Sequence, residues 1–170
     1  MLKLFRLHIL FLFVVTALVT GCSENEMEPV DGDHHIPLEV DEAISDYIIE
    51  KYSSINHGTE KQFEVHKIYG TSESNGILSV YMWSYYGGFN KSTGLENQAG
   101  HSLPAVIRLK KEVDHYVVKE YTETQDGELY SSSLKKMFPE RYLKLVGQDT
   151  GNIEDLQKEM DQKVSKWLES

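Results

Sequence analysis

The sequence predicts an α+β domain, in which a helix is followed by an antiparallel sheet and then by further helices. Apolar residues recur every three or four positions around residue 45 and again around residue 160, which is the spacing of amphipathic helices. Between these stretches lie alternating or aromatic-rich runs separated by turn residues, which is typical of strands joined as hairpins. Strands grouped together, with helices before and after them, indicate α+β rather than α/β.

The first helix is predicted over residues 40–52. Asp41 and Glu42 lie at its start, where carboxylates interact favourably with the positive end of the helix dipole. The polar segment of residues 53–58 then ends the helix. Its apolar face comprises Val40, Ala43, Ile44, Tyr47, Ile48 and Tyr52.

Four strands are expected to follow as a meander. Asn75 and Gly76 predict a tight hairpin turn, because both accept the positive φ angles that such a turn needs. Residues 77–86 are apolar or aromatic at nearly every position, which predicts a central strand covered on both faces. Short connections favour antiparallel neighbours. The predicted strands are residues 63–70, 77–86, 105–110 and 115–122.

The last third of the chain is predicted to be helical, and we expect the helices to pack on one face of the sheet. Two short helices, over residues 131–138 and 140–146, are separated by Pro139. A final helix is expected after Asn152, which can cap it. This order of elements is similar in outline to cystatin-like folds. The apolar stripe of the final helix comprises Ile153, Leu156, Met160, Val164, Trp167 and Leu168.

One predicted connection, residues 87–103, is unusually long. Loops of more than about 12–15 residues are uncommon in compact domains and are either functional or flexible. Aromatic and polar side chains in and beside this one suggest a groove that binds a peptide or a glycan. The alternative is a flexible hairpin tip above core tyrosines. The candidate ligand-binding residues are Tyr85, Tyr86, Phe89, Asn90, Glu96 and His101.

The sequence predicts no catalytic residue. Glu96, His101 and Ser102 contain the residue types of a serine hydrolase, but adjacent residues on a strand point to opposite faces. Ser102 also lacks the Gly-x-Ser-x-Gly pattern that exposes a nucleophile.

No metal site or cofactor is predicted either. Asp31, Asp33, His34 and His35 form the densest group of potential ligands. They lie in a flexible segment, where ordering entropy opposes binding.

Residues 1–22 have the pattern of an export signal peptide. Lys3 and Arg6 precede an apolar run of about 13 residues, whereas a membrane-spanning helix needs roughly 20. The run ends in Val19-Thr20-Gly21-Cys22, which resembles the lipobox of bacterial lipoproteins, and the chain is similar to small lipoproteins of the Gram-positive type. The resemblance implies that residues 1–21 are removed and that Cys22 carries a diacylglycerol. The mature protein would then be anchored on the extracytoplasmic face of the cell membrane.

Composition limits the remaining possibilities. The formal net charge is −10, which disfavours nucleic-acid binding and favours solubility. Cys22 is the only cysteine, so its acylation leaves no thiol for a disulfide or for catalysis. Residues 22–37 are acidic and predict a disordered tether. Residues 38–170 are long enough for one domain.

Three functions remain open from the sequence. The first is a tethered, non-catalytic domain that binds a peptide, a cell-wall fragment or an exported protein through residues 85–101. The second is a hydrolase or a metal-dependent enzyme of the cell envelope. The third is a membrane-tethered regulator or sensor that docks a partner protein through the basic and aromatic segment of residues 135–142.

Overall fold

The computed structural model describes residues 30–31, 36–54 and 58–170 of the chain. Cys22, the lipobox and the group Asp33, His34 and His35 lie outside these residues, as does most of the predicted tether. The α+β prediction is confirmed. The elements are β1 (Val30–Asp31), α1 (Leu38–Ser53), β2 (Lys61–Ser74), β3 (Ile77–Phe89), β4 (Ala99–Glu112), β5 (His115–Glu123), α2 (Tyr130–Met137), α3 (Glu140–Asp149) and α4 (Glu154–Leu168).

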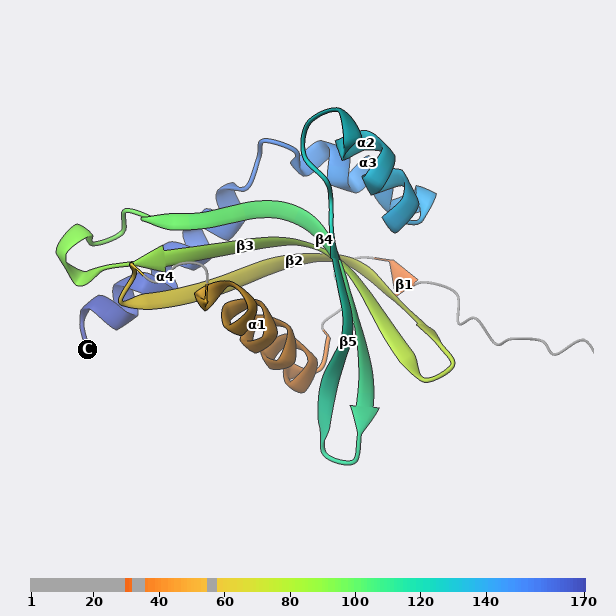
Figure 1. Cartoon of the computed structure of the whole chain (residues 1–170), viewed down its shortest axis with the longest axis horizontal. Coiled ribbons are helices and arrows are strands. Elements are labelled where there is room, and N and C mark those ends of the chain that lie inside the picture. The colour runs from red at the N-terminus through yellow and green to blue at the C-terminus, as the bar shows by residue number, and fades with distance from the viewer. Residues whose placement is uncertain (1–29, 32–35, 55–57) are drawn as a thin grey trace, which may run out of the picture.

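Strands β2 to β5 form the predicted antiparallel meander, and the two-residue β1 pairs with the outer edge of β2 (Figure 1). The hairpin turn between β2 and β3 is confirmed, since Asn75 and Gly76 have φ angles of 52° and 73°. Strand β3 lies between β2 and β4 and is buried along most of its length, so the central-strand prediction is also confirmed.

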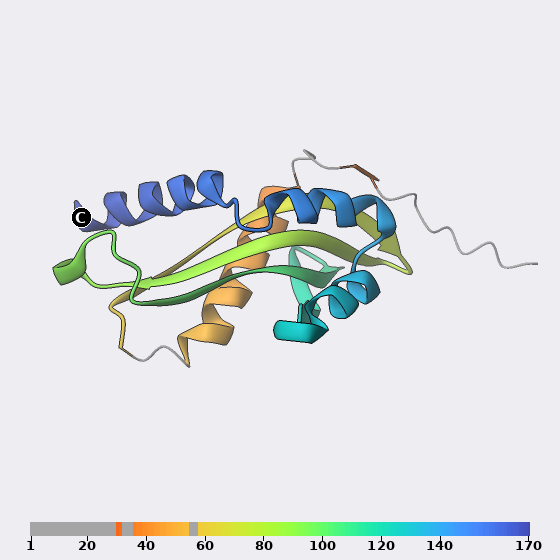
Figure 2. The same ribbon diagram turned by 90° about the horizontal axis from the view of Figure 1, so that it is seen from above.

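Helices cover both faces of the sheet, and the prediction that they share one face is wrong. Helix α1 lies on one side and α4 on the other (Figure 2). Val80, Met82 and Tyr86 of β3 pack on the α1 side. Tyr81, Trp83 and Tyr85 pack against the C-terminal helices. Because β3 carries large apolar side chains on both faces, each face needs its own helical layer.

The connection between β3 and β4 is shorter than predicted, because both strands extend into residues 87–103. Only residues 90–98 connect them, and residues Lys91–Thr93 form a 3₁₀ turn. Gly87, Gly88 and Gly100 lie in the strands, where they allow close packing: a Cβ at Gly100 would lie 2.3 Å from the Tyr86 carbonyl oxygen. A Cβ at Gly88 would lie 2.7 Å from Oγ1 of Thr59.

The C-terminal helices follow the predicted periodicity. Leu156, Met160 and Val164 of α4 are buried, as the apolar stripe predicts. Asn152 is not the cap of this helix. Ile153 occupies the N-cap position without a side-chain hydrogen bond, and the Asn152 backbone N–H donates to the Asp149 carbonyl at 2.8 Å.

Gly100→Ala should destabilise the fold by about 1–3 kcal/mol, because the new methyl group must displace the β3 backbone. Gly147→Ala is the matched control: it lies in α3 with nothing within 4 Å of its Cβ position. That change should raise stability by up to about 1 kcal/mol through helix propensity. Urea unfolding measures both, and equal stability of the two variants would contradict the close-packing interpretation.

Candidate functional site

A buried carboxylate lies between α1 and the sheet. Glu64 of β2 is only 1% exposed and faces α1. The Oγ atoms of Ser45 on α1 and Ser84 on β3 each donate a hydrogen bond of 2.8 Å to its carboxylate. These two donors compensate part of the cost of removing a negative charge from water.

His66 supplies the opposite charge. Its Nδ1 lies 3.0 Å from Oε2 of Glu64, and its Nε2 lies 3.3 Å from Oδ1 of Asp41. Burial by itself lowers the pKa of this imidazole, but the carboxylates of Glu64 and Asp41 outweigh that effect and raise it to about 9. His66 is therefore protonated at neutral pH and links the first turn of α1 to β2.

Local periodicity brings this network together. Glu64 and His66 are two residues apart on a strand and so share one face. Ser84 is paired with His66 in the β2–β3 register. Asp41 and Ser45 are four residues apart and so share one face of α1. Sequence reasoning missed the network, although Glu-x-His within a strand is the signal that could have pointed to it.

His66 and Asp41 line a groove of about 750 Å³ between the start of α1, the outer edge of β2 and α4. This volume lies within the range of about 300–1,000 Å³ that is typical of ligand sites. Asp155 and Glu159 of α4 add negative charge to the groove, and Lys67 adds a positive charge. Its apolar lining comprises Ile36, Pro37, Leu38, Ile68 and Leu156.

Two of the six predicted ligand-binding residues meet beneath the end of α1. The rings of Tyr86 and His101 stack with their centroids 5.4 Å apart. The ring of Tyr52 lies 4.2 Å from that of His101, and its hydroxyl donates to Glu123. Burial lowers the pKa of His101, so this imidazole is neutral at pH 7. The cluster forms part of the interior, because Tyr86 is fully buried.

The other four predicted residues lie elsewhere. Tyr85 faces α4 and donates from its hydroxyl to Oε1 of Gln157 at 3.0 Å. Phe89 is buried in that same core. Asn90 accepts a hydrogen bond from the backbone N–H of Glu60, and Glu96 is exposed in the connection.

The prediction of one groove lined by all six residues is therefore wrong. Neighbouring residues of a strand point to opposite faces, so Tyr85 and Tyr86 are separated by the sheet itself. The pairing of residues 87–89 with β2 also turns part of the expected loop into strand, which buries Phe89.

The aromatic residues of the 135–142 segment are also part of the core. Phe138 and Tyr142 are buried against Tyr81, with ring centroids 5.7 and 5.3 Å from it. Lys135 and Lys136 remain exposed on α2. The basic side chains of this segment are thus exposed on α2, whereas its aromatic side chains, from the end of α2 and from α3, are buried in the core.

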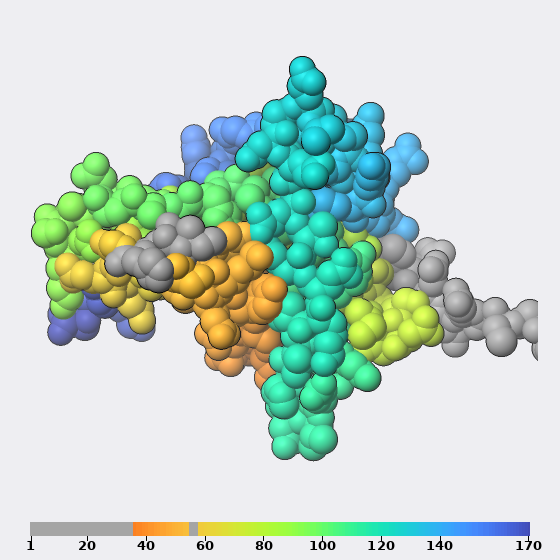
Figure 3. Space-filling model, viewed as in Figure 1, coloured from red at the N-terminus to blue at the C-terminus, as the bar shows by residue number. Residues whose placement is uncertain are grey.

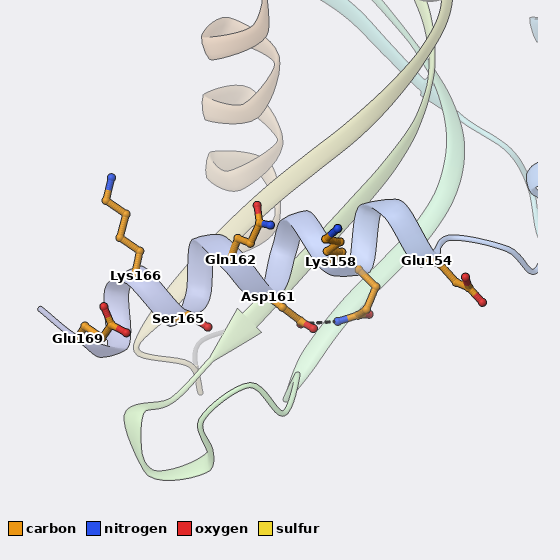
Figure 4. Close-up of a pocket in the computed structure, with 8 residues that line it drawn as sticks. Glu154, Lys158, Asp161, Gln162, Ser165, Lys166 and Glu169 are labelled. Atoms are coloured by element: carbon orange, nitrogen blue, oxygen red, sulfur yellow. Dashed lines mark hydrogen bonds between the residues drawn. The ribbon is translucent and has the colours of Figure 1, made fainter.

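Two further surface depressions are less enclosed. Figure 4 shows one along the outward side of α4 alone, where Nε2 of Gln157 donates to Oδ1 of Asp161 at 2.8 Å. The other, of about 500 Å³, lies between α1 and β5, and the β4–β5 hairpin projects past it (Figure 3). Its acidic wall is an exposed side of α1, where charge favours solubility. These carboxylates belong to Glu39, Glu42, Asp46 and Glu50.

Within the described part of the chain, no three His, Cys, Asp or Glu side chains are placed to hold a metal ion. Among the same residues, no helix has the length and apolar character needed to cross a membrane. No protein-family model, curated protein or solved structure matches the chain. The geometry of the groove and of the network behind it therefore carries the functional argument.

His66→Gln should remove a pH-dependent part of the stability. The pKa of His66 is about 9 in the folded chain and near 6.5 when unfolded, so folding favours its protonated form. This contribution is fully present below pH 6.5 and is lost as the pH rises through 9. Between about pH 6 and 10, the parent should lose roughly 3 kcal/mol more unfolding free energy than the variant.

Urea unfolding across this pH range measures the difference. His115→Gln replaces an exposed histidine at the start of β5 and should follow the parent curve. Parallel curves for the parent and for His66→Gln would show that Asp41 and Glu64 do not hold the proton.

Proposed function

We propose that the protein is a lipid-anchored, non-catalytic binding domain of a bacterial cell envelope, with its ligand site in the groove between α1 and α4. The signal-like residues 1–21 and the lipobox ending in Cys22 support the anchor. The observation that carries the binding site is the groove of about 750 Å³, which combines apolar walls with charged groups held in fixed positions.

The chemistry of the network favours binding over hydrolysis. A nucleophilic serine needs a base that accepts its proton. Ser45 and Ser84 instead donate to the Glu64 carboxylate, and two carboxylates keep His66 protonated at neutral pH. Glu64 is also buried, so a substrate could not reach the carboxylate oxygens that the two serines contact.

The position of the groove relative to the anchor supports the same proposal. Ile36, Pro37 and Leu38 line the groove and lie where the proposed tether of residues 22–37 joins α1. A flexible coil of about 15 residues has a typical end-to-end distance of about 20–25 Å. The groove would therefore face partners at or near the membrane surface.

Cys22→Ser should release the protein from the membrane, because it removes the thiol that carries the lipid. In a detergent-phase partition of cells that express the full chain, the parent should enter the detergent phase and the variant the aqueous phase. Ser23→Ala, one residue further on, is the matched control and should behave as the parent. Detergent partitioning of Cys22→Ser would overturn the lipoprotein proposal.

Binding is tested by thermal unfolding of the chain from residue 22 onward with Cys22→Ser, against muropeptides, cell-wall sugars and short peptides. A ligand present at 100 times its dissociation constant adds about 2.7 kcal/mol, which raises the midpoint by several degrees. Leu38→Asp alters an exposed residue of the groove and should abolish the shift. Leu129→Asp, at a similarly exposed leucine outside the groove, should preserve it. A shift that survives Leu38→Asp would place the site elsewhere.

A further inference from the structure

We propose that the groove binds an extended polypeptide segment of a partner protein, which adds to the free edge of β2 as an antiparallel strand. The inference rests on the proposed binding function and narrows the ligand to a peptide with alternating basic and apolar side chains. It is carried by the unpaired edge of β2, by the direction of its carbonyl groups and by the two walls beside it.

Along most of its length, the outer edge of β2 has no strand paired with it among the described residues. Strand β3 pairs with β2 from Lys61 to Ser74, whereas β1 pairs only with Gly70 and Thr71 on the other side. Within the described residues, positions 61–69 have no strand beside them on that edge. Such an edge presents backbone donors and acceptors to an incoming strand. The pairing of β1 shows that this edge accepts an antiparallel strand.

The direction of the edge groups follows from one contact and from the strand register. Nζ of Lys163, on α4, donates to the backbone carbonyl of Glu64 at 3.0 Å. The β3 register gives the same direction, because the carbonyl of Gly88, the partner of Gln62, points away from β2 and accepts from the N–H of Gln98. The Glu64 carbonyl, two residues along from Gln62, therefore projects away from β3. Backbone groups alternate in direction along a strand, so those of Gln62 and His66 project from the same edge. A partner strand would hydrogen-bond to this series and replace the Lys163 contact.

Two helices form the walls of the groove beside this edge. Leu38 lies on the α1 side and Leu156 on the α4 side, so an added strand would find apolar surface on both. Asp155 and Glu159 make the α4 wall acidic. The side chains of a strand alternate between its two faces, so a segment with basic residues toward α4 and apolar residues toward α1 fits best.

A second copy of the chain is a poorer occupant. Its formal charge of −10 would oppose the approach of another copy carrying the same charge. The favoured partner is a different protein that supplies a basic, extended segment.

The test uses the chain from residue 22 onward with Cys22→Ser, and a fluorescent nine-residue peptide in which valine alternates with lysine. Gln62→Pro and Gln62→Ala lose the same side-chain contacts, but only proline also removes the N–H that projects from the edge. Proline is tolerated at such edge positions. Anisotropy should show binding to Gln62→Ala within about twofold of the parent and at least about tenfold weaker binding to Gln62→Pro.

A peptide of the same sequence with alternate backbone nitrogens methylated keeps its charge but cannot form the ladder, so it should not bind. Hydrogen exchange should show protection of the Gln62, Glu64 and His66 amides by the unmodified peptide. Equal binding of the methylated peptide, or equal affinity of Gln62→Pro and Gln62→Ala, would overturn strand addition and leave only charge attraction.

A second variant covers the case in which Gln62→Pro fails to fold. Asp155→Lys combined with Glu159→Lys changes only exposed side chains of α4. This double variant should bind the valine–lysine peptide more weakly and a valine–glutamate peptide more tightly. Unchanged affinities would overturn the proposed contact between basic side chains of the partner and α4. Binding of a sugar that Leu38→Asp abolishes, with no peptide binding, would overturn strand addition but retain the binding groove. Self-association that Gln62→Pro removes would assign the edge to a second copy and overturn the partner proposed here.

Discussion

The buried carboxylate of Glu64 fixes the position of α1 over the sheet. A charge in the interior costs several kcal/mol unless it is paired and hydrogen-bonded, and removing one partner of such a pair typically costs about 3–5 kcal/mol. Its side-chain partners are Ser45 on α1, His66 on β2 and Ser84 on β3, while His66 also reaches Asp41. A shift of α1 along the sheet would break several of these contacts at once. The α1 wall of the groove is therefore held by directional interactions.

The opposite wall, helix α4, is positioned by apolar packing and by single hydrogen bonds. Helix α4 is held mainly by a stripe of apolar side chains that includes Leu156 and Met160. Apolar burial contributes about 25 cal/mol per Å² but has little directional preference. The hydrogen bonds from Tyr85 to Gln157 and from Lys163 to the Glu64 carbonyl are directional and fix where α4 lies on the sheet. Both helices thus bury an apolar face against the sheet, and α1 is positioned in addition by the charged network around Glu64.

The sequence predicted the elements well because their signals are local. Periodicity located both long helices, and Asn75-Gly76 located the hairpin to the residue. It failed where distant pairing decides the outcome. The sequence predicted one long connection over residues 87–103, yet Gly87, Gly88 and Gly100 each lie in a strand at a point of close packing. The local Glu-x-His pattern places Glu64 and His66 on one face of β2, but it does not reveal that α1 and β3 supply Asp41 and the two serines as their partners.

The protonation state of His66 connects the fold to the proposed binding function. A catalytic imidazole needs a pKa near the working pH so that it can both accept and release a proton. Two carboxylates move the pKa of His66 to about 9, which fixes its charge and its orientation at neutral pH. A group held in this way exchanges protons poorly, but it adds rigidity to the wall that it lines. Rigid walls lower the entropic cost of binding, because less of the site has to become ordered when a ligand arrives. The arrangement that makes His66 a poor general base therefore suits a preformed groove that binds an extended segment of a partner protein.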